Sequence, residues 1–174
     1  EEILRMGEMA AAQLEAALDV IDRRDAKAAE RIIANDEAID ALELQVSHDA
    51  MKLALRGPLA RDLREILAAL RIASDIERIG DYASNVAKRS MALNLSPPLP
   101  HTRGLGSLGR LVVRQVRKVL LAYREGDIEA ARQVDEHTQI SLRVIQPWGE
   151  YLSQTINRLS PIQFVDALRR CGVR

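Results

Sequence analysis

Apolar residues recur every three to four positions along residues 3–93 of this 174-residue chain, which is the period of an amphipathic α-helix. The pattern predicts three helices, over about residues 3–21, 26–56 and 59–93. Asp25 stands directly before the second helix and is a typical N-cap residue. Gly57 and Pro58 separate the second and third helices, because proline cannot continue the hydrogen-bond ladder and glycine suits the turn. We therefore expect the second and third helices to pack antiparallel, and we expect no β-strand.

Proline and glycine are concentrated in residues 96–106, which are expected to lie outside any helix and to link two halves of the chain. The halves share a weak internal repeat, because a shift of 102 positions aligns identical residues. The aligned pairs include Gly7 with Gly109, Gln13 with Gln115, and Leu18 with Leu120. Two copies of one helical unit are the physical interpretation of such a repeat.

The repeat predicts an all-α helical bundle in three parts: a first three-helix unit over residues 1–95, the linker over 96–106, and a second unit over 107–174. The later part of the second unit departs from the first. Two acidic positions lose their charge in the alignment, Asp36 against Thr138 and Asp40 against Leu142. Pro147 also interrupts any long helix there. We therefore predict that the second unit is incomplete or aberrant.

The composition narrows the class of protein. Acidic and basic residues balance at 25 each, so no bulk attraction to nucleic acid is implied. Aromatic residues make up only 3% of the chain, and an interior of Leu, Ile, Val and Ala suits packing between helices. The single cysteine, Cys171, excludes an internal disulfide and a cysteine-based zinc site. Because no run approaches 18 apolar residues and no signal peptide opens the sequence, we expect a cytoplasmic protein without direct membrane insertion.

The third predicted helix carries oxygen-bearing side chains four residues apart, Glu77, Asp81 and Asn85, which form a ledge on one side. One apolar set leads along that side towards them: Leu59, Leu63, Ile66, Leu70 and Ala73. A second apolar set points about 120° away: Ile72, Ile76, Ile79 and Ala83. The buried face therefore either runs into the acids or rotates off them. Gly80 indicates close approach of another group, because it lowers helix stability by roughly 1 kcal/mol against alanine.

The second predicted helix carries a matching ledge of Asp36, Asp40 and Glu43. An antiparallel turn brings residue 40 to the height of residue 77, since both lie about 17–19 residues from it at about 1.5 Å per residue. The candidate metal ligands are Asp36, Asp40, Glu77, Asp81 and Asn85. Hard oxygen donors without histidine favour Fe³⁺, Mn²⁺, Mg²⁺ or Ca²⁺. The alternative is that these acids are surface ion-pair partners of Arg31, Arg71 and Arg78.

Residues 74–88, Ser-Asp-Ile-Glu-Arg-Ile-Gly-Asp-Tyr-Ala-Ser-Asn-Val-Ala-Lys, resemble the signature of the PhoU family of phosphate-signalling regulators. Residues 59–71 resemble the lead-in to that signature, and residues 33–43 resemble the preceding helix. The resemblance covers roughly residues 1–134. It implies three-helix repeats whose paired acidic motifs bind multinuclear metal clusters, with iron, manganese or magnesium as the expected ion.

The same resemblance implies a function. It points to a negative regulator of phosphate uptake and phosphate-starvation signalling, with an indirect effect on transcription. Such a protein would bind a sensor histidine kinase and a phosphate ABC transporter, as a homodimer, without catalysis. It would be cytoplasmic and would reach the inner face of the membrane through these partners.

Two other functions stay open. A metal-storing or redox enzyme with a helical bundle would need Glu-x-x-His on two helices, and no histidine here has a glutamate three residues before it. The histidines are His48, His101 and His137. A plain helical scaffold, whose acids bind no metal, is the second alternative. A basic face on the predicted fourth helix is a candidate docking surface for an acidic partner, although such faces are usually solvated: Arg110, Arg114, Arg117, Lys118 and Arg124.

Overall fold

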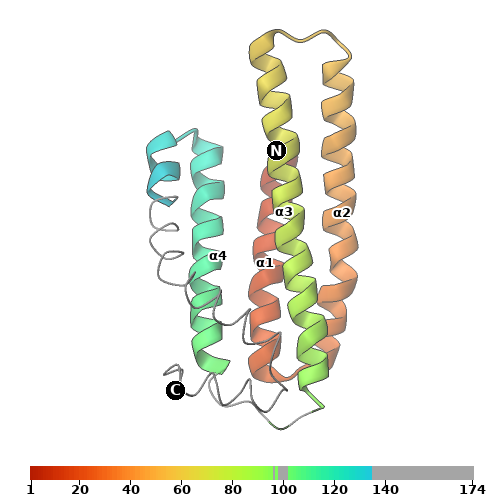
Figure 1. The fold of residues 1–174 in the computed structure, drawn as a ribbon, viewed down its shortest axis with the longest axis vertical. Helices are drawn as coiled ribbons and strands as arrows, with labels where there is room; N and C mark the ends of the chain where they lie inside the picture. The colour runs from red at the N-terminus through yellow and green to blue at the C-terminus, as the bar shows by residue number, and fades with distance from the viewer. Residues whose placement is uncertain (96, 98–101, 135–174) are drawn as a thin grey trace, which may run out of the picture.

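Helices make up the regular structure of the computed structural model (Figure 1), which describes residues 1–95, 97 and 102–134. They are α1 (Glu2–Arg23), α2 (Ala26–Ala54), α3 (Ala60–Leu93) and α4 (Thr102–Glu125). A further helical segment begins at residue 128 and is described as far as residue 134. These ranges contain no strand, so the all-α prediction is confirmed.

The helix ends follow from residues at the turns. Asp25 is the N-cap of α2, where its side chain accepts a 3.0 Å hydrogen bond from the Ala28 N–H. Asp127, which the 102-residue shift aligns with Asp25, accepts a 2.9 Å bond from the Ala130 N–H in the same way. Gly57 adopts a φ of +68° between α2 and α3, a left-handed conformation that favours glycine. The predicted cap and turn are therefore confirmed.

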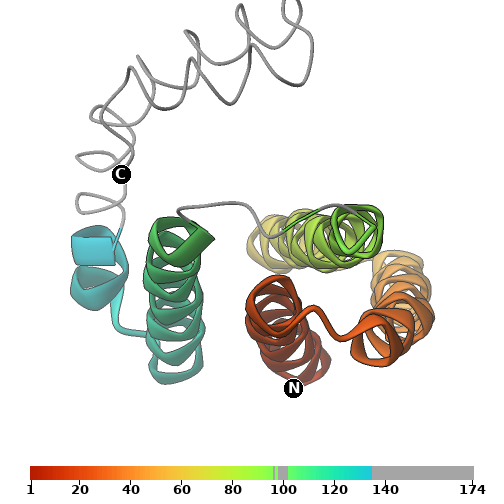
Figure 2. The same ribbon diagram turned by 90° about the horizontal axis from the view of Figure 1, so that it is seen from below.

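The first three helices form a bundle, and α4 lies outside it. Figure 2 shows α1, α2 and α3 at the corners of a triangle when viewed end-on, with α4 on the other side of α1. Within the described ranges α1 contacts the other three labelled helices, α2 also contacts α3, and α4 contacts α1 alone among them. The antiparallel packing predicted for α2 and α3 is confirmed (Figure 1).

The core of the bundle decides between the two apolar faces that the sequence left open on α3. Ile76 and Ala83 of the second set are buried, and Ile72 and Ile79 pack against the core. Ala73, the last residue of the first set, is also buried. The first set fails towards the start of the helix, because Leu59 is 77% exposed and Leu63 41% exposed. Of the two alternatives, the face that runs into the acids is therefore not the buried one at the start of α3. Ile76 packs in a core that contains residues of α1 and α2, while Glu77 is half-buried and Asp81 is exposed.

The contact between α1 and α4 joins residues that the internal repeat aligns. A Cβ atom on Gly7 would overlap the Leu120 side chain, and one on Gly109 would overlap Leu18. The two contacts are reciprocal, since the shift pairs Gly7 with Gly109 and Leu18 with Leu120. The absence of side chains on the glycines lets the helices approach closely. Residues 135–174, and with them Thr138, Leu142 and Pro147, lie outside the described residues, so the division into two units stays a prediction.

The linker prediction is wrong for its last residues. Residues 102–106 were expected outside any helix, yet α4 begins at Thr102. Gly106 is buried, and a Cβ atom there would lie 3.3 Å from the Asp22 carboxylate of α1. Packing against α1 therefore outweighs the low helix propensity of glycine, a common tertiary override.

The turn end of the α2–α3 hairpin extends past α1. Figure 1 shows the N-terminus partway along the hairpin. Several apolar side chains of this end are exposed: Leu44, Met51, Leu53, Leu55, Leu59, Leu63 and Leu67. None of the helices in the described part of the chain is both long enough and apolar enough to span a membrane.

Candidate carboxylate site

The predicted acids lie on two neighbouring helices at the same level of the hairpin. Asp36 and Asp40 belong to α2, and Glu77 and Asp81 belong to α3. Asp36 and Glu77 are half-buried, while Asp40 and Asp81 are exposed. Gly80 explains the close approach, because a Cβ atom there would lie 3.0 Å from Ile39 Cδ1 and 3.2 Å from Asp36 Oδ1. The suspected role of Gly80 in close packing is thus confirmed.

The electrostatics of the site are those of carboxylates that repel one another. Partial burial raises the pKa of Asp40, and the charges of Asp36, Asp81, Glu37 and Glu43 raise it further. The pKa of Glu77 is also raised, first by partial burial and then by Asp81 and Asp40, with smaller contributions from Glu43 and Asp36. Each helix therefore feels the acids of the other.

The ion-pair alternative finds no support in this part of the structure. Among the described residues, no ion pair joins the four acids to Arg31, Arg71 or Arg78. The Arg78 guanidinium instead donates a 3.3 Å hydrogen bond to the Tyr82 hydroxyl, one turn along α3. The acids are therefore held near one another without a neutralising side chain.

Gln13 of α1 is the member of the site that sequence reasoning missed. Its side chain is only 7% exposed. Its Nε2 donates a 2.8 Å hydrogen bond to Asp36 Oδ1 and a longer one, 3.4 Å, to the Gly80 carbonyl. The signal was present, because Gln13 lies on the buried stripe of α1 between Ala10 and Ala17. A polar residue in the middle of an apolar stripe needs a buried partner.

The donor chemistry of the site fits a hard cation, but the side chains do not converge. Carboxylates suit Mg²⁺, Mn²⁺ or Fe³⁺. In the described residues, however, no three His, Cys, Asp or Glu side chains are close enough together to hold an ion. Asn85 is exposed on α3, one turn after Asp81. Binding an ion would therefore require the carboxylates to rotate towards one another.

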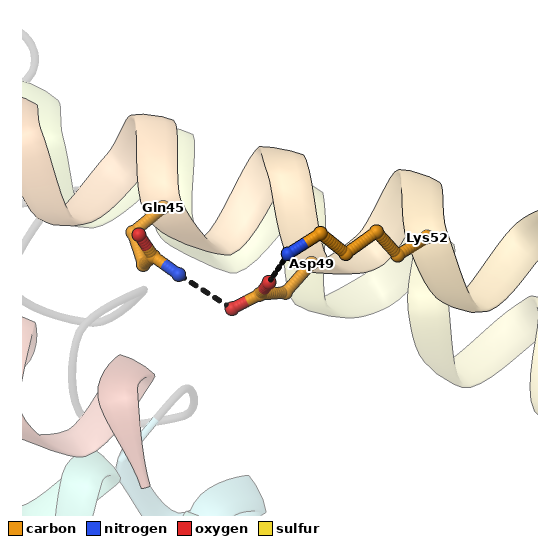
Figure 3. Close-up of polar contacts among 3 residues, drawn as sticks. All are labelled: Gln45, Asp49 and Lys52. Carbon is orange, nitrogen blue, oxygen red and sulfur yellow. Dashed lines mark hydrogen bonds and ion pairs between the residues drawn. The ribbon is translucent and has the colours of Figure 1, made fainter.

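A second carboxylate on α2, outside this site, has neighbours of a different kind. Gln45 donates a 2.8 Å hydrogen bond to Asp49 Oδ2, and the Lys52 ammonium lies 3.3 Å from Oδ1 (Figure 3). Both hydrogen bonds lower the pKa of Asp49, and the bond from Gln45 has the larger effect. The contacts span one helical turn, so they need no other helix.

The basic face of α4 is partly used within the chain. Arg117 Nη2 lies 2.7 Å from Glu15 Oε2, and its Nε lies 3.9 Å from Glu8 Oε2. Arg117 therefore joins α4 to α1 rather than standing free for a partner. The docking role of the remaining basic residues stays a prediction.

The match to a protein-family model extends well beyond the signature at residues 74–88. The family model described as the PhoU domain matches residues 3–90, which include α1, α2 and most of α3. The phosphate-specific transport system accessory protein PhoU homolog of Xylella fastidiosa is 67% identical over 136 residues. That alignment covers 78% of this chain and 58% of the relative, so the chain spans little more than half of that protein.

Two further comparisons extend over more of the chain. The protein of the same description from Caulobacter vibrioides is 35% identical over 173 residues, covering 94% of this chain and 75% of the relative. The crystal structure of PhoU from Pseudomonas aeruginosa superposes with a TM-score of 0.72 at 26% sequence identity. That superposition covers 97% of this chain and 84% of the other.

Proposed function

Because the chain belongs to the PhoU family, we propose that it is a negative regulator of phosphate uptake and phosphate-starvation signalling. It acts by binding a phosphate ABC transporter and a sensor histidine kinase, without catalysis of its own. The observation that carries the proposal is the 67% identity to an accessory protein of phosphate-specific transport, because that alignment spans 136 residues. Its place in the cell is the cytoplasm, at the inner face of the membrane when the transporter is bound.

The genetic test removes the protein from its host. Deletion should switch on phosphate-starvation genes in high phosphate, because a negative regulator is lost. A plasmid copy of the intact gene should restore repression. The readout is the expression of one phosphate-starvation gene, measured in high and in low phosphate. Starvation genes that stay silent in high phosphate after deletion would overturn the regulator proposal.

The second part of the proposal is a metal site formed by Asp36, Asp40, Glu77 and Asp81. Its support is the raised pKa of Asp40 and of Glu77 together with the close approach of α2 and α3 at Gly80. A bound Mn²⁺, Mg²⁺ or Fe³⁺ would supply the positive charge that these carboxylates lack. The Asn85 amide, one turn farther along α3, is a candidate for an additional ligand. The residues themselves would have to move towards the ion, since they do not converge without it.

Thermal melting tests this metal site. Each ion should stabilise the parent protein by mass action and so raise its melting temperature. At 100 times the dissociation constant the stabilisation is about 2.7 kcal/mol. Asp81→Ala should respond less, while its stability in chelator is equal to or higher than that of the parent, because one repelling charge is gone. Asp75→Ala is the matched control, since Asp75 is an exposed acid of α3 outside the cluster.

One combination of results contradicts the metal proposal. If no ion changes the melting temperature of the parent, and Asp81→Ala melts lower than the parent in chelator, the four acids are structural partners. The chain would then be a helical scaffold in this region.

The family resemblance also leads us to propose a homodimer. The exposed apolar residues at the turn end of the hairpin offer surface for such a contact. Light scattering on the purified protein should give twice the mass of the chain. A mass equal to that of one chain at micromolar concentration would contradict the dimer.

A further inference from the structure

The helices α1 and α4 meet through the same packing stripe. Its glycine and apolar residues recur with the spacing of a coiled-coil seam, and the 102-residue shift aligns the two sets: Gly7, Ala11, Leu14 and Leu18 in α1, and Gly109, Val113, Val116 and Leu120 in α4. Gly7 meets Leu120 and Gly109 meets Leu18, so the two helices run antiparallel. Because each helix carries both a glycine and a leucine at these places, each would also fit a second copy of itself.

The charges beside the stripe have opposite signs in the two helices. Starting directly after the glycine, every seventh position is acidic in α1 and basic in α4. The acidic row of α1 and the aligned basic row of α4 are Glu8, Glu15 and Asp22 against Arg110, Arg117 and Arg124. Charged side chains in this place, next to the seam between two helices, set the choice and the orientation of the partner helix.

Arg117 shows how the two rows interlock. Its Nη2 lies 2.7 Å from Glu15 Oε2, and its Nε lies 3.9 Å from Glu8 Oε2, so it stands between two acids of α1. The side chains of Arg117 and Glu15 are 42% and 45% exposed. Each pair is therefore individually weak, and the rows act through their number.

Opposite charges also approach near the end of α1. A Cβ atom on Gly106 would lie 3.3 Å from Asp22 Oδ2 and 3.4 Å from the two terminal nitrogens of Arg110. Two α1 helices packed along the stripe would instead bring acidic row against acidic row. Two α4 helices would bring basic row against basic row. The packing residues thus fit three pairings, and the charges favour one of them.

We propose that the acidic and basic rows determine which partner the stripe accepts. They direct α1 onto α4 of the same chain and reject the same helix of a second copy. Attraction in the right pair and repulsion in the wrong ones both contribute to such a choice. The covalent connection favours pairing within one chain, but it does not by itself exclude a second copy from the stripe. This inference depends neither on a metal ion nor on the proposed regulatory function.

The labelling rate of a buried thiol measures the contact in the full chain. Val113 is 1% exposed, and α4 contacts α1 alone among the labelled helices of the described ranges. Val113→Cys in a Cys171→Ser background should therefore react with a thiol reagent only when α4 leaves α1. Changing the acidic row to arginine, or the basic row to glutamate, should raise the labelling rate about 3- to 100-fold in low salt. Both changes together should return the rate close to that of the parent.

A matched control and high salt separate the rows from a general effect of charge. Arg114 and Lys118 are exposed bases of α4 that belong to neither row. Arg114→Glu with Lys118→Glu should leave the labelling rate near that of the parent, and an equal rise would overturn the inference. At 1 M salt, where the Debye length is about 3 Å, the effect of changing either row should shrink. An effect that persists undiminished there would also overturn it.

Mixing two variants tests the choice of partner directly. The variant with two basic rows and the variant with two acidic rows should form a mixed assembly, which light scattering detects as a mass above that of either variant alone. No increase in mass, or no rescue when both rows are exchanged in one chain, would overturn the inference. If a full row exchange prevents a cooperative melt, Arg117→Glu replaces it. Adding Glu15→Arg should then slow the labelling again, and labelling that stays as fast would overturn the inference.

Discussion

Asp40 and Asp49 lie nine residues apart on α2, and their surroundings move their pKa values in opposite directions. The neighbours of Asp40 are other acids, three of them on α2 about one turn away and one on the facing helix. The neighbours of Asp49 are the amide of Gln45 and the ammonium of Lys52, both on its own helix (Figure 3). Asp40 therefore experiences repulsion from other acids, whereas Asp49 has favourable partners on its own helix.

This difference separates the part of α2 for which we propose a ligand from a part whose charges are paired locally. A surface carboxylate that is paired within one turn is what helical spacing ordinarily provides. A cluster of acids with raised pKa values and no basic partner lowers stability unless another group brings positive charge. Acids that lie together and raise one another's pKa are candidate functional positions for this reason.

The largest effect is expected from breaking the packing that brings the acids of the two helices together. Ile39 is fully buried next to Gly80, so Ile39→Ala should lower the free energy of unfolding by roughly 2–5 kcal/mol. Leu44 lies one and a half turns farther along α2 and is 66% exposed. Leu44→Ala should change the free energy by about 0.5 kcal/mol or less. Urea unfolding of both variants is the measurement, and equal losses would mean that the core lies elsewhere.

The sequence was sufficient to predict the helices because each one has a period, a cap or a turn that depends on local residues. Asp25 and Gly57 are such local signals, and the structure confirms both. The buried face of α3 was not predictable in the same way, since two apolar stripes of similar strength ran along one helix. The contacts with α1 and α2 decided which residues of α3 are buried, among them Ile76 and Ala83.

In the candidate site, too, features that depend on local sequence were predictable, and contacts between distant residues were not. The prediction that Asp40 and Glu77 lie at the same height came from counting residues on either side of the predicted turn. Gln13 did not follow, because its partner Asp36 is 23 residues away in sequence and on another helix. The start of α4 inside a glycine-rich stretch was missed for a similar reason, since the packing that fixes it comes from α1.

A smaller effect is expected from neutralising one acid in each region. Asp40→Asn should raise the free energy of unfolding at neutral pH by on the order of 0.5 kcal/mol, because it removes repulsion at an exposed position. Asp49→Asn should lower it, because two favourable contacts lose their charged acceptor. Urea unfolding at pH 7 in low salt measures both, and changes of the same sign would contradict the comparison.

The contributions of the two regions to stability should change in opposite directions as the pH falls. A carboxyl whose pKa is raised by folding binds its proton more tightly in the folded state. The penalty from Asp40 and Glu77 is therefore present at neutral pH and disappears as the pH falls through their raised values towards the ordinary carboxyl range. Asp49 has a lowered pKa, so its favourable contribution is present above the ordinary value and is lost as the pH falls through the lowered one. As the pH falls from 7 to about 4, the ordinary carboxyl range, the stability of Asp40→Asn should therefore gain less than that of the parent.

The smallest effect concerns the two bonds to Asp49, which are expected to differ in their response to salt. Gln45→Ala removes the shorter, uncharged contact and should raise the pKa of Asp49 at low and high salt alike. Lys52→Ala removes a charge at an exposed site, so its effect should shrink at 1 M salt, where the Debye length is about 3 Å. Carbon-detected NMR titration of the Asp49 carboxyl measures both variants. If Gln45→Ala leaves the pKa of Asp49 unchanged while the effect of Lys52→Ala disappears at 1 M salt, the amide bond is not what holds this pKa down, and Asp49 is governed by charge in the same way as Asp40.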